Sequence, residues 1–397
     1  MRRLLALFVA ATCAAPLTAQ TTWIVNSAGG GQFTDIPPAI AAASPGDRIV
    51  VQGAGPYSAF VLDKGLDVEA VNSALTPKIE VVGVPAGQRA RVAGFHLQNG
   101  SGRVQVSVEA CAGGVSLVDL QEIVPVPYYG SGIGEAGLRI VDSPRVLVDR
   151  GAFFGTADPV GGFGLFMSNS RAAIIEATFK GGRALNAMGG GNPGKAGAAL
   201  SSGSHAFLSG VDTIGGDCAA GIFGASASGG HGLTTDATSA AVVLAASHLE
   251  GRPGCAFGSP GQAAVGNVQY TLDCTIIGAV GPTTTSTPNR PALTMPTSIP
   301  VGSNLTTALQ GGPGELVWLA FDLAHDYVPF SALGGAIVLT PNLILAGGVL
   351  LDGAGSGSLS FPIPNLPAAQ NLDVIGQGLA LVGGSWVLTG PDQTRTQ

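Results

Sequence analysis

The feature that most constrains this chain is a unit that is repeated between residues 137 and 278. Each copy opens with a glycine, continues with short apolar runs and closes with another glycine. One such unit cannot bury its own apolar side chains, so neighbouring copies must stack on one another. The repeat therefore predicts a solenoid of short strands. Its copies align without a gap at 137–155, 164–182 and 197–215, and looser copies begin at Gly232 and Ala264.

Insertions separate the matched parts of the repeat. They are rich in glycine and alanine and fall at 157–163, 184–196 and 216–230. Insertions at one corner of a solenoid gather on one surface, which is the usual place for binding. We call this surface the loop face, and we expect it to carry the function.

Composition narrows the class of protein. Charged residues make up 11% of the chain and apolar residues 46%, which argues against intrinsic disorder. Arg2 and Arg3 precede a short apolar run that ends near Ala19, so residues 1–19 read as a signal peptide that is too short to span a bilayer. The net charge of -7 argues against nucleic acid as a partner. We expect a secreted or cell-surface protein without a membrane span in the mature chain.

The entry to the solenoid predicts a cap. Asp35 can cap a short helix, and Pro37 and Pro38 suit its first turn. A helix at this point would cover the open strand edges of the first coil. The segment 33–51, with Pro56, Tyr57 and residues 61–64 after it, resembles the entry of right-handed parallel β-helix proteins of the pectin lyase-like superfamily. The resemblance implies such a β-helix over residues 20–283.

The C-terminal part has a different character. Residues 284–291 read as a linker rich in Thr, Ser and Pro, and residues 292–397 consist of apolar runs separated by Gly, Pro and Asn turns. This pattern predicts a small antiparallel β-sandwich. The module is loosely similar to the C-terminal domains of secreted bacterial proteins. The expected fold class is therefore all-β, a right-handed parallel β-helix followed by a β-sandwich.

Two cysteines fall at the same corner of successive coils. Stacked strands lie about 4.8 Å apart, so Cys218 and Cys255 are within the span that a disulfide tolerates. Export permits such a bond. Two alternatives are a pair of buried thiols, or a bond between Cys255 and Cys274.

Two carboxylates also fall at matching positions of neighbouring copies. Stacking would bring Asp149 and Glu176 within about 5 Å, a separation that suits a retaining glycosidase or a calcium site. Arg150 lies beside them. The alternative interpretation is a solvated outer face on which nearby cations neutralise the acids.

The remaining candidates lie near the loop face. His231 stands in a Gly-His-Gly sequence that is found in polygalacturonase-like hydrolases of this fold, but the other motifs of that family are missing. Asp212 and Asp217, near His231 and Asp236, are weak calcium candidates. The histidines follow no zinc-ligand spacing, so calcium is the only cofactor that we consider.

These patterns favour a non-catalytic protein that presents its loop face to an extracellular glycan or a surface protein. The alternative is a polysaccharide lyase or glycoside hydrolase that acts on an acidic polysaccharide. That activity would need two acids and a base that converge in a groove, and the sequence gives no such set at diagnostic spacing. Whether the chain is an enzyme is left open.

Overall fold

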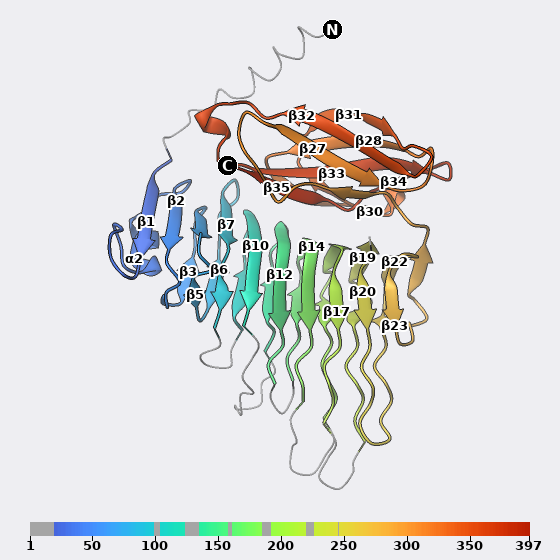
Figure 1. Ribbon diagram of the computed structural model, residues 1–397. Coiled ribbons are helices and arrows are strands. Elements are labelled where there is room, and N and C mark those ends of the chain that lie inside the picture. The colour runs from blue at the N-terminus through green and yellow to red at the C-terminus, as the bar shows by residue number, and fades with distance from the viewer. Residues whose placement is uncertain are drawn as a thin grey trace.

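The computed structural model describes residues 20–98, 104–123, 135–157, 161–184, 192–219, 226–244 and 246–397. The expected signal peptide, residues 1–19, lies outside the described residues. The described chain forms a parallel β-helix with an antiparallel β-sandwich along its flank (Figure 1). The all-β fold class is confirmed.

The largest sheet of the β-helix, sheet A, is built from parallel strands that successive coils contribute. Its main path runs through β1 (Thr22–Asn26), β2 (Arg48–Gln52), β4 (Asp67–Ala70), β7 (Arg89–Ala93), β10 (Gly114–Glu122), β12 (Val146–Phe154), β14 (Arg171–Lys180), β16 (His205–Ser209), β19 (Ala240–Leu244), β22 (Val268–Thr271) and β24 (Thr285–Thr287).

Sheet A bends, and its far leg carries shorter strands. They are β5 (Leu75–Thr76), β8 (His96–Leu97), β17 (Asp212–Ile214), β20 (His248–Glu250) and β23 (Thr275–Ile277). A second parallel sheet, sheet B, closes each coil with β3 (Phe60–Leu62), β6 (Ile79–Val82), β9 (Val106–Glu109), β11 (Leu138–Val141), β13 (Leu165–Ser168), β15 (Ala198–Ser201), β18 (Leu233–Thr235) and β21 (Ala264–Val265).

The bend in sheet A lies at a column of residues with positive φ. Asp119, Arg150 and Glu176 have φ values of 50°, 51° and 48°, and Gly210 continues the column at 62°. A left-handed residue turns the chain sharply, so the strand changes direction there while its hydrogen bonds resume on the far side. The column therefore divides each long strand into two legs.

The interior is apolar throughout. Alternate side chains from both sheets point inward, and the largest fully buried ones include Phe95, Phe153 and Phe179. The Phe153 and Phe179 rings stack with centroids 5.5 Å apart. Residues that pair across the ladder of successive coils thus lie on top of one another.

The N-terminal end of the stack is capped as expected. The helix α2 (Ile36–Ala42) has Asp35 as its N-cap, and the side chain of Asp35 accepts a hydrogen bond from the Ile36 amide. Ile36, Ala39 and Ile40 are buried against the first coil.

The sandwich is built from two facing sheets. One contains β25 (Ala292–Thr294), β27 (Asn304–Gln310) and β32 (Ser356–Pro362). The other contains β26 (Ser298–Ile299), β28 (Leu316–Asp322), β31 (Ile344–Leu350), β33 (Asp373–Val382), β34 (Ser385–Leu388) and β35 (Asp392–Thr396). A hairpin of β29 (His325–Phe330) and β30 (Gly335–Leu339) and two short turns, η1 (Ser331–Leu333) and η2 (Pro367–Ala369), complete it.

The segment expected to be a linker needs a correction. Residues 284–291 include β24, which pairs in parallel with β22 and so extends sheet A. Its Thr side chains are compatible with a strand, and the exposed edge of β22 supplies the partner. The parallel stack therefore continues to the start of the sandwich.

Among the described residues, no helix has the length and apolar character needed to cross a membrane.

Candidate functional site

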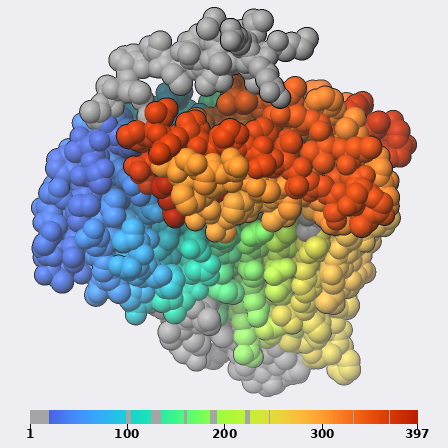
Figure 2. All heavy atoms as spheres, turned by 45° about the horizontal axis from the view of Figure 1, so that its top comes forward, coloured from blue at the N-terminus to red at the C-terminus, as the bar shows by residue number. Residues whose placement is uncertain are grey.

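The sandwich covers the outer face of sheet A, along much of the β-helix (Figure 2). The contact is apolar at its centre. Leu147, Ala173, Ile175, Phe207 and Leu244 of the β-helix pack against Tyr327, Ala336, Val338, Leu339 and Ile375 of the sandwich. This outer face is therefore closed to a polymer chain over these coils.

A network of ion pairs joins the two domains toward the N-terminal end. Asp67 and Glu69 of β4 meet Arg48 and Arg91 from the neighbouring strands, with Arg48 Nη2 2.6 Å from Glu69 Oε2 and Arg91 Nη1 3.0 Å from Asp67 Oδ1. Arg395 of β35 reaches across, and its Nη2 lies 2.6 Å from Asp67 Oδ2.

Asp373 of the sandwich completes this network. It lies 3.0 Å from Arg91 Nε and 2.9 Å from Arg395 Nη1. Burial would raise the pKa of Asp67, but the guanidinium groups of Arg91 and Arg395 outweigh burial and hold this pKa below its ordinary value. Three carboxylates thus balance three guanidinium groups.

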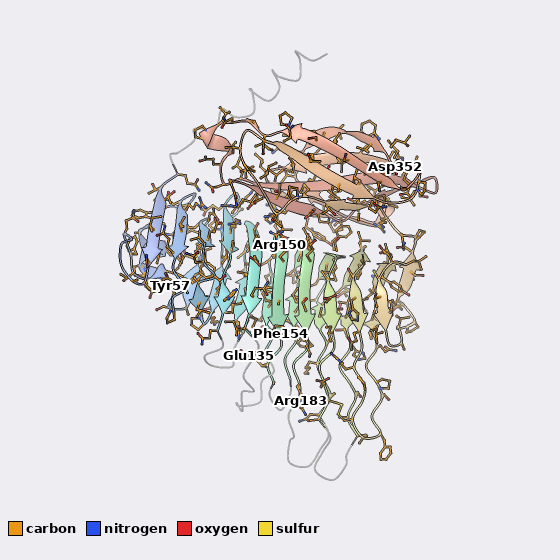
Figure 3. The ribbon with its side chains drawn as sticks, in the orientation of Figure 1. Tyr57, Glu135, Arg150, Phe154, Arg183 and Asp352 are labelled. Carbon is orange, nitrogen blue, oxygen red and sulfur yellow. A yellow bond between two sulfur atoms is a disulfide. The ribbon has the colours of Figure 1, made fainter. Side chains whose placement is uncertain are left out.

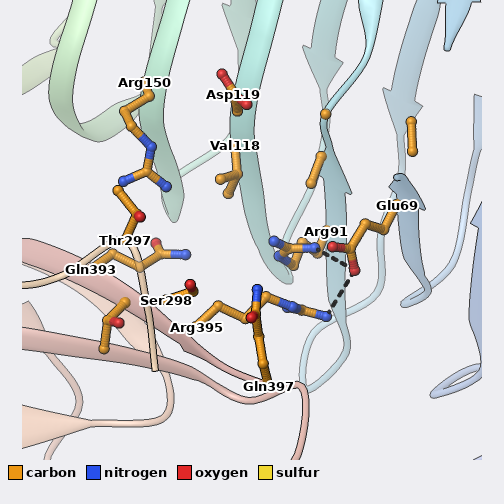
Figure 4. Close-up of a pocket in the computed structure, with 14 residues that line it drawn as sticks. Glu69, Arg91, Val118, Asp119, Arg150, Thr297, Ser298, Gln393, Arg395 and Gln397 are labelled. Carbon is orange, nitrogen blue, oxygen red and sulfur yellow. Dashed lines mark ion pairs between the residues drawn. The ribbon is translucent and has the colours of Figure 1, made fainter. Parts of the chain in front are cut away.

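A polar cleft of about 410 Å³ opens beside this network (Figure 4). The buried amide of Gln393 reaches its edge, and Gln393 Oε1 has no hydrogen-bond partner among the described residues. The charged and polar residues that line the cleft are Glu69, Arg91, Asp119, Arg150, Thr297, Ser298, Gln393, Thr394, Arg395 and Gln397.

The predicted pair Asp149 and Glu176 does not stack, so that expectation is wrong. Asp149 pairs across the ladder with Ile175, whereas Glu176 occupies the left-handed column above Arg150. Asp149 is fully buried under the sandwich and Glu176 is exposed. The two carboxylates therefore occupy different environments.

The reason is a single extra residue in the first copy. The Ser143 amide donates to Ser170 Oγ, which aligns these two serines. Beyond them, Val146 pairs with Ala172, so the first copy has one more residue between serine and strand. That residue belongs to the Pro144–Arg145 pair, and proline cannot supply an amide to the ladder.

Arg150 is the ion-pair partner of Asp149. Arg150 Nη2 lies 2.7 Å from Asp149 Oδ2, at an angle outside hydrogen-bond geometry. Burial is the main cause that raises the pKa of Asp149 to about 7, and nearby Asp392 and Glu176 add to it while Arg150 opposes it. Figure 3 places Arg150 on the side of the β-helix that faces the sandwich.

The loop face lies on the opposite side from the sandwich, where Figure 3 labels Arg183. Its described backbone segments form layers, one from each coil, and these layers pack directly on one another. A Cβ added to Gly182 would lie 1.9 Å from Thr156 O, and one added to Gly230 would lie 2.1 Å from Lys195 O. Single hydrogen bonds link the layers, as from Gly182 N to Gly162 O. Glycine is thus required where these layers touch.

The expected disulfide between Cys218 and Cys255 forms on this face, with Cα atoms 5.7 Å apart. Cys274, considered as the rival partner, is a free thiol. Cys255 also pairs with Ala227 in an antiparallel bridge and starts a turn in which Gly258 N donates to Cys255 O.

This turn presents Phe257, whose side chain is 96% exposed. Ala256 before it has a φ of 53°, which shapes the turn. An aromatic side chain in this position has no core to pack against, and Phe257 is the most exposed large apolar side chain among the described residues. No repeat position identifies Phe257, and the only sequence signal was its place between Cys255 and Gly258.

The remaining predicted residues do not converge. His231 Nδ1 accepts from the Gln262 amide at 2.9 Å, and burial lowers the pKa of this histidine. Asp212 accepts from Thr178 Oγ1, and Asp217 is exposed at 3.9 Å from Arg252 Nε. Asp236 caps a turn at another corner through the Ser202 amide. Within the described ranges, no three His, Cys, Asp or Glu side chains gather as a metal site would require.

No protein-family model matches the chain, and no curated protein matches it either. The pectin lyase-like resemblance therefore stays a prediction, whereas the parallel β-helix is confirmed.

Two solved structures were found with low structural similarity. One is a superoxide reductase (neelaredoxin) from Ignicoccus hospitalis, with a TM-score of 0.18 and 9% identity over 27% of this chain and 80% of that chain. The other is the enzymatically active domain of bacteriophage CBA120 tailspike protein 2, with a TM-score of 0.18 and 12% identity over 96% of this chain and 62% of that chain. The chain thus spans less than two thirds of the tailspike domain.

Proposed function

We propose that this chain is a non-catalytic extracellular protein that binds a glycan or a surface protein through its loop face. The observation that carries the proposal is Phe257, an almost fully exposed aromatic side chain on a turn that a disulfide anchors. Aromatic side chains are the commonest anchors of binding surfaces, and a fixed turn lowers the entropy lost on binding.

Two further observations support this proposal. The sandwich buries Asp149 and closes the outer face of sheet A over the coils that it covers, so Asp149 cannot reach a polymer. Asp67, Glu69 and Asp373 are each engaged by arginines. The loop face, by contrast, is not covered by the sandwich and is held by the disulfide between Cys218 and Cys255.

The test combines binding with activity. Mature protein would be passed over immobilised neutral and acidic glycans, with and without calcium, and both retention and released product would be measured. We expect retention without product, and we expect Phe257→Ser to weaken it by about 30-fold or more, as for an interface hot spot. Leu272→Ser is the matched control, because Leu272 is also exposed, at 66%.

The outcomes separate the two hypotheses. Product in any sample would replace binding with the lyase or hydrolase alternative. Retention that is equal in wild type and Phe257→Ser would place the binding surface away from the loop face. If no glycan is retained, the glycan-binding part of the proposal is overturned.

A further inference from the structure

The polar cleft between the two domains is built from strands of both. Its walls come from β4, β7, β10 and β12 of the β-helix and from β26 and β35 of the sandwich. Thr297 and Ser298 are exposed at its mouth, whereas Gln393 in its wall is 2% exposed. A volume of about 410 Å³ falls in the range of small-molecule sites. The cleft is therefore open to solvent and large enough for one small molecule.

Gln393 Oε1 is the atom that points to a ligand. It is buried and has no hydrogen-bond partner among the described residues. A buried acceptor without a partner costs free energy, so folded proteins nearly always satisfy it. Figure 4 shows the side-chain amide of Gln393 extending into the cleft on the side of Arg150. A donor group placed in the cleft would supply the missing hydrogen bond.

The wall that carries Gln393 is held firmly in place. Gln393 pairs with Ile375 across the ladder between β35 and β33, and its backbone amide donates to Asp392 Oδ1 at 2.7 Å. Two residues further on, Arg395 is fixed by its ion pair with Asp67. A ligand would therefore meet a site that is already formed, which lowers the free energy lost on binding.

The charges around the cleft select the class of ligand. Each guanidinium group that lines it already has a carboxylate partner, because Arg91 and Arg395 pair with Asp67 and Arg150 pairs with Asp149. An anionic group offers only acceptors and would leave the buried acceptor unpaired. A cation would meet three guanidinium groups. A neutral hydroxyl group both donates and accepts, so it fits this set of partners.

We propose that the cleft binds one neutral sugar unit. Two adjacent hydroxyl groups of the sugar would share the wall, one donating to Gln393 Oε1 and the other accepting from the guanidinium group of Arg150. The hydroxyl groups of Thr297 and Ser298 offer further hydrogen bonds at the mouth. This inference goes beyond the proposed function, because the cleft lies beside the sandwich and does not involve Phe257 on the loop face.

The test is calorimetric titration of the mature protein with glucose, galactose, mannose and N-acetylglucosamine, with galacturonate as the acidic comparison. We expect at least one neutral sugar to bind at a single site, more tightly than galacturonate. Gln393→Leu removes the acceptor and keeps most of the volume, so it should weaken binding by about 10-fold. Its melting temperature without sugar should not fall, because the wild type buries this acceptor without a partner.

Ser298→Trp is the second variant. It fills the mouth of the cleft from an exposed position and leaves Gln393 in place, so it should abolish binding. Ser358→Trp is the matched control, because Ser358 on β32 is also exposed and lies outside the cleft. If Gln393→Leu melts below the wild type, Ser298→Trp decides alone. No binding of any of the neutral sugars, tighter binding of galacturonate, or full binding by Ser298→Trp would overturn the proposal.

These results remain distinguishable from those on the loop face. Phe257→Ser should bind the free sugars as the wild type does. Gln393→Leu should keep any glycan retention that depends on Phe257. Failure of one site therefore leaves the expected result for the other unchanged.

Discussion

Arg395 Nη2 in the sandwich lies 2.6 Å from Asp67 Oδ2 in the β-helix, although 328 positions separate the two residues in sequence. Both side chains are largely buried, at 10% and 15% exposed. The contact therefore ties the last strand of the chain to one of its first coils.

The first prediction concerns this contact. Arg395→Gln leaves Asp67, Glu69 and Asp373 with one guanidinium group fewer, and removing one partner of a buried pair costs about 3–5 kcal/mol of unfolding free energy. Urea unfolding followed by tryptophan fluorescence measures this loss, because Trp318 and Trp386 report on the sandwich. Arg139→Gln is the control. Its partner Glu109 and Arg139 itself are more than a third exposed, so the cost should stay within about 1 kcal/mol. If Arg395→Gln and Arg139→Gln lose the same unfolding free energy, the buried network stabilises the protein no more than an exposed ion pair does.

The second prediction concerns His325, which is buried between the domains. Its Nε2 donates to Arg145 O at 3.2 Å, and burial lowers its pKa to about 4. The unfolded chain takes up this proton near pH 6.5, whereas the folded protein takes it up near pH 4. The free energy of unfolding therefore falls as the pH drops through this window, by about 3 kcal/mol.

His325→Gln removes this titration while a side-chain amide can still donate to Arg145 O. Unfolding free energies of both proteins would be measured between pH 7 and pH 4. The advantage of wild type over the variant should shrink by about 3 kcal/mol over this range. Two parallel curves would contradict a buried neutral imidazole.

The third prediction concerns Glu122, a carboxyl group that is buried in the β-helix. Burial raises the pKa of Glu122 to about 8, and the hydrogen bond from the Phe154 amide opposes this rise. The folded protein holds this proton up to about pH 8, and the unfolded chain releases it near pH 4.5. Stability should therefore fall as the pH rises through this window, by at most about 4–5 kcal/mol.

Glu122→Gln keeps the shape and can still accept from Phe154. It should match wild type near pH 4.5 and exceed it in stability near pH 9, as judged by thermal melting at each pH. A variant that is less stable than wild type at pH 9 would show that the carboxylate is needed in its charged form.

The repeat predicted the stacked coils and the disulfide because these depend on the stacking of equivalent positions, and the local pattern of Asp35, Pro37 and Pro38 predicted the capping helix. The same reasoning failed at Asp149 and Glu176, where one residue beside Pro144 shifts the ladder register. A shift of one residue changes which side chains meet, and nothing in the composition of the repeat reveals it.

The sequence pattern could not predict the contacts between the two domains. Arg395 and Asp67 belong to different folding units, and no spacing rule links positions so far apart. Phe257 falls in the glycine-rich segment 251–261, where sequence does not distinguish a core residue from an exposed one. These features depend on how the sandwich docks and on how the loops stack.

The last prediction concerns the stacked glycines of the loop face. In Gly182→Ala the new methyl group would lie 1.9 Å from Thr156 O, which is a backbone atom. The layers must then separate, and the hydrogen bond from Gly182 N to Gly162 O at 2.6 Å is lost. We expect a loss of about 3 kcal/mol in unfolding free energy, as for severe overpacking. Gly353→Ala is the matched control, since a Cβ there meets nothing within 4 Å. Hydrogen exchange should localise the damage to the loop face, with faster exchange of the neighbouring amides of Gly216 and Gly230. If both variants unfold at the same urea concentration as wild type, the layers are not held by close backbone contact.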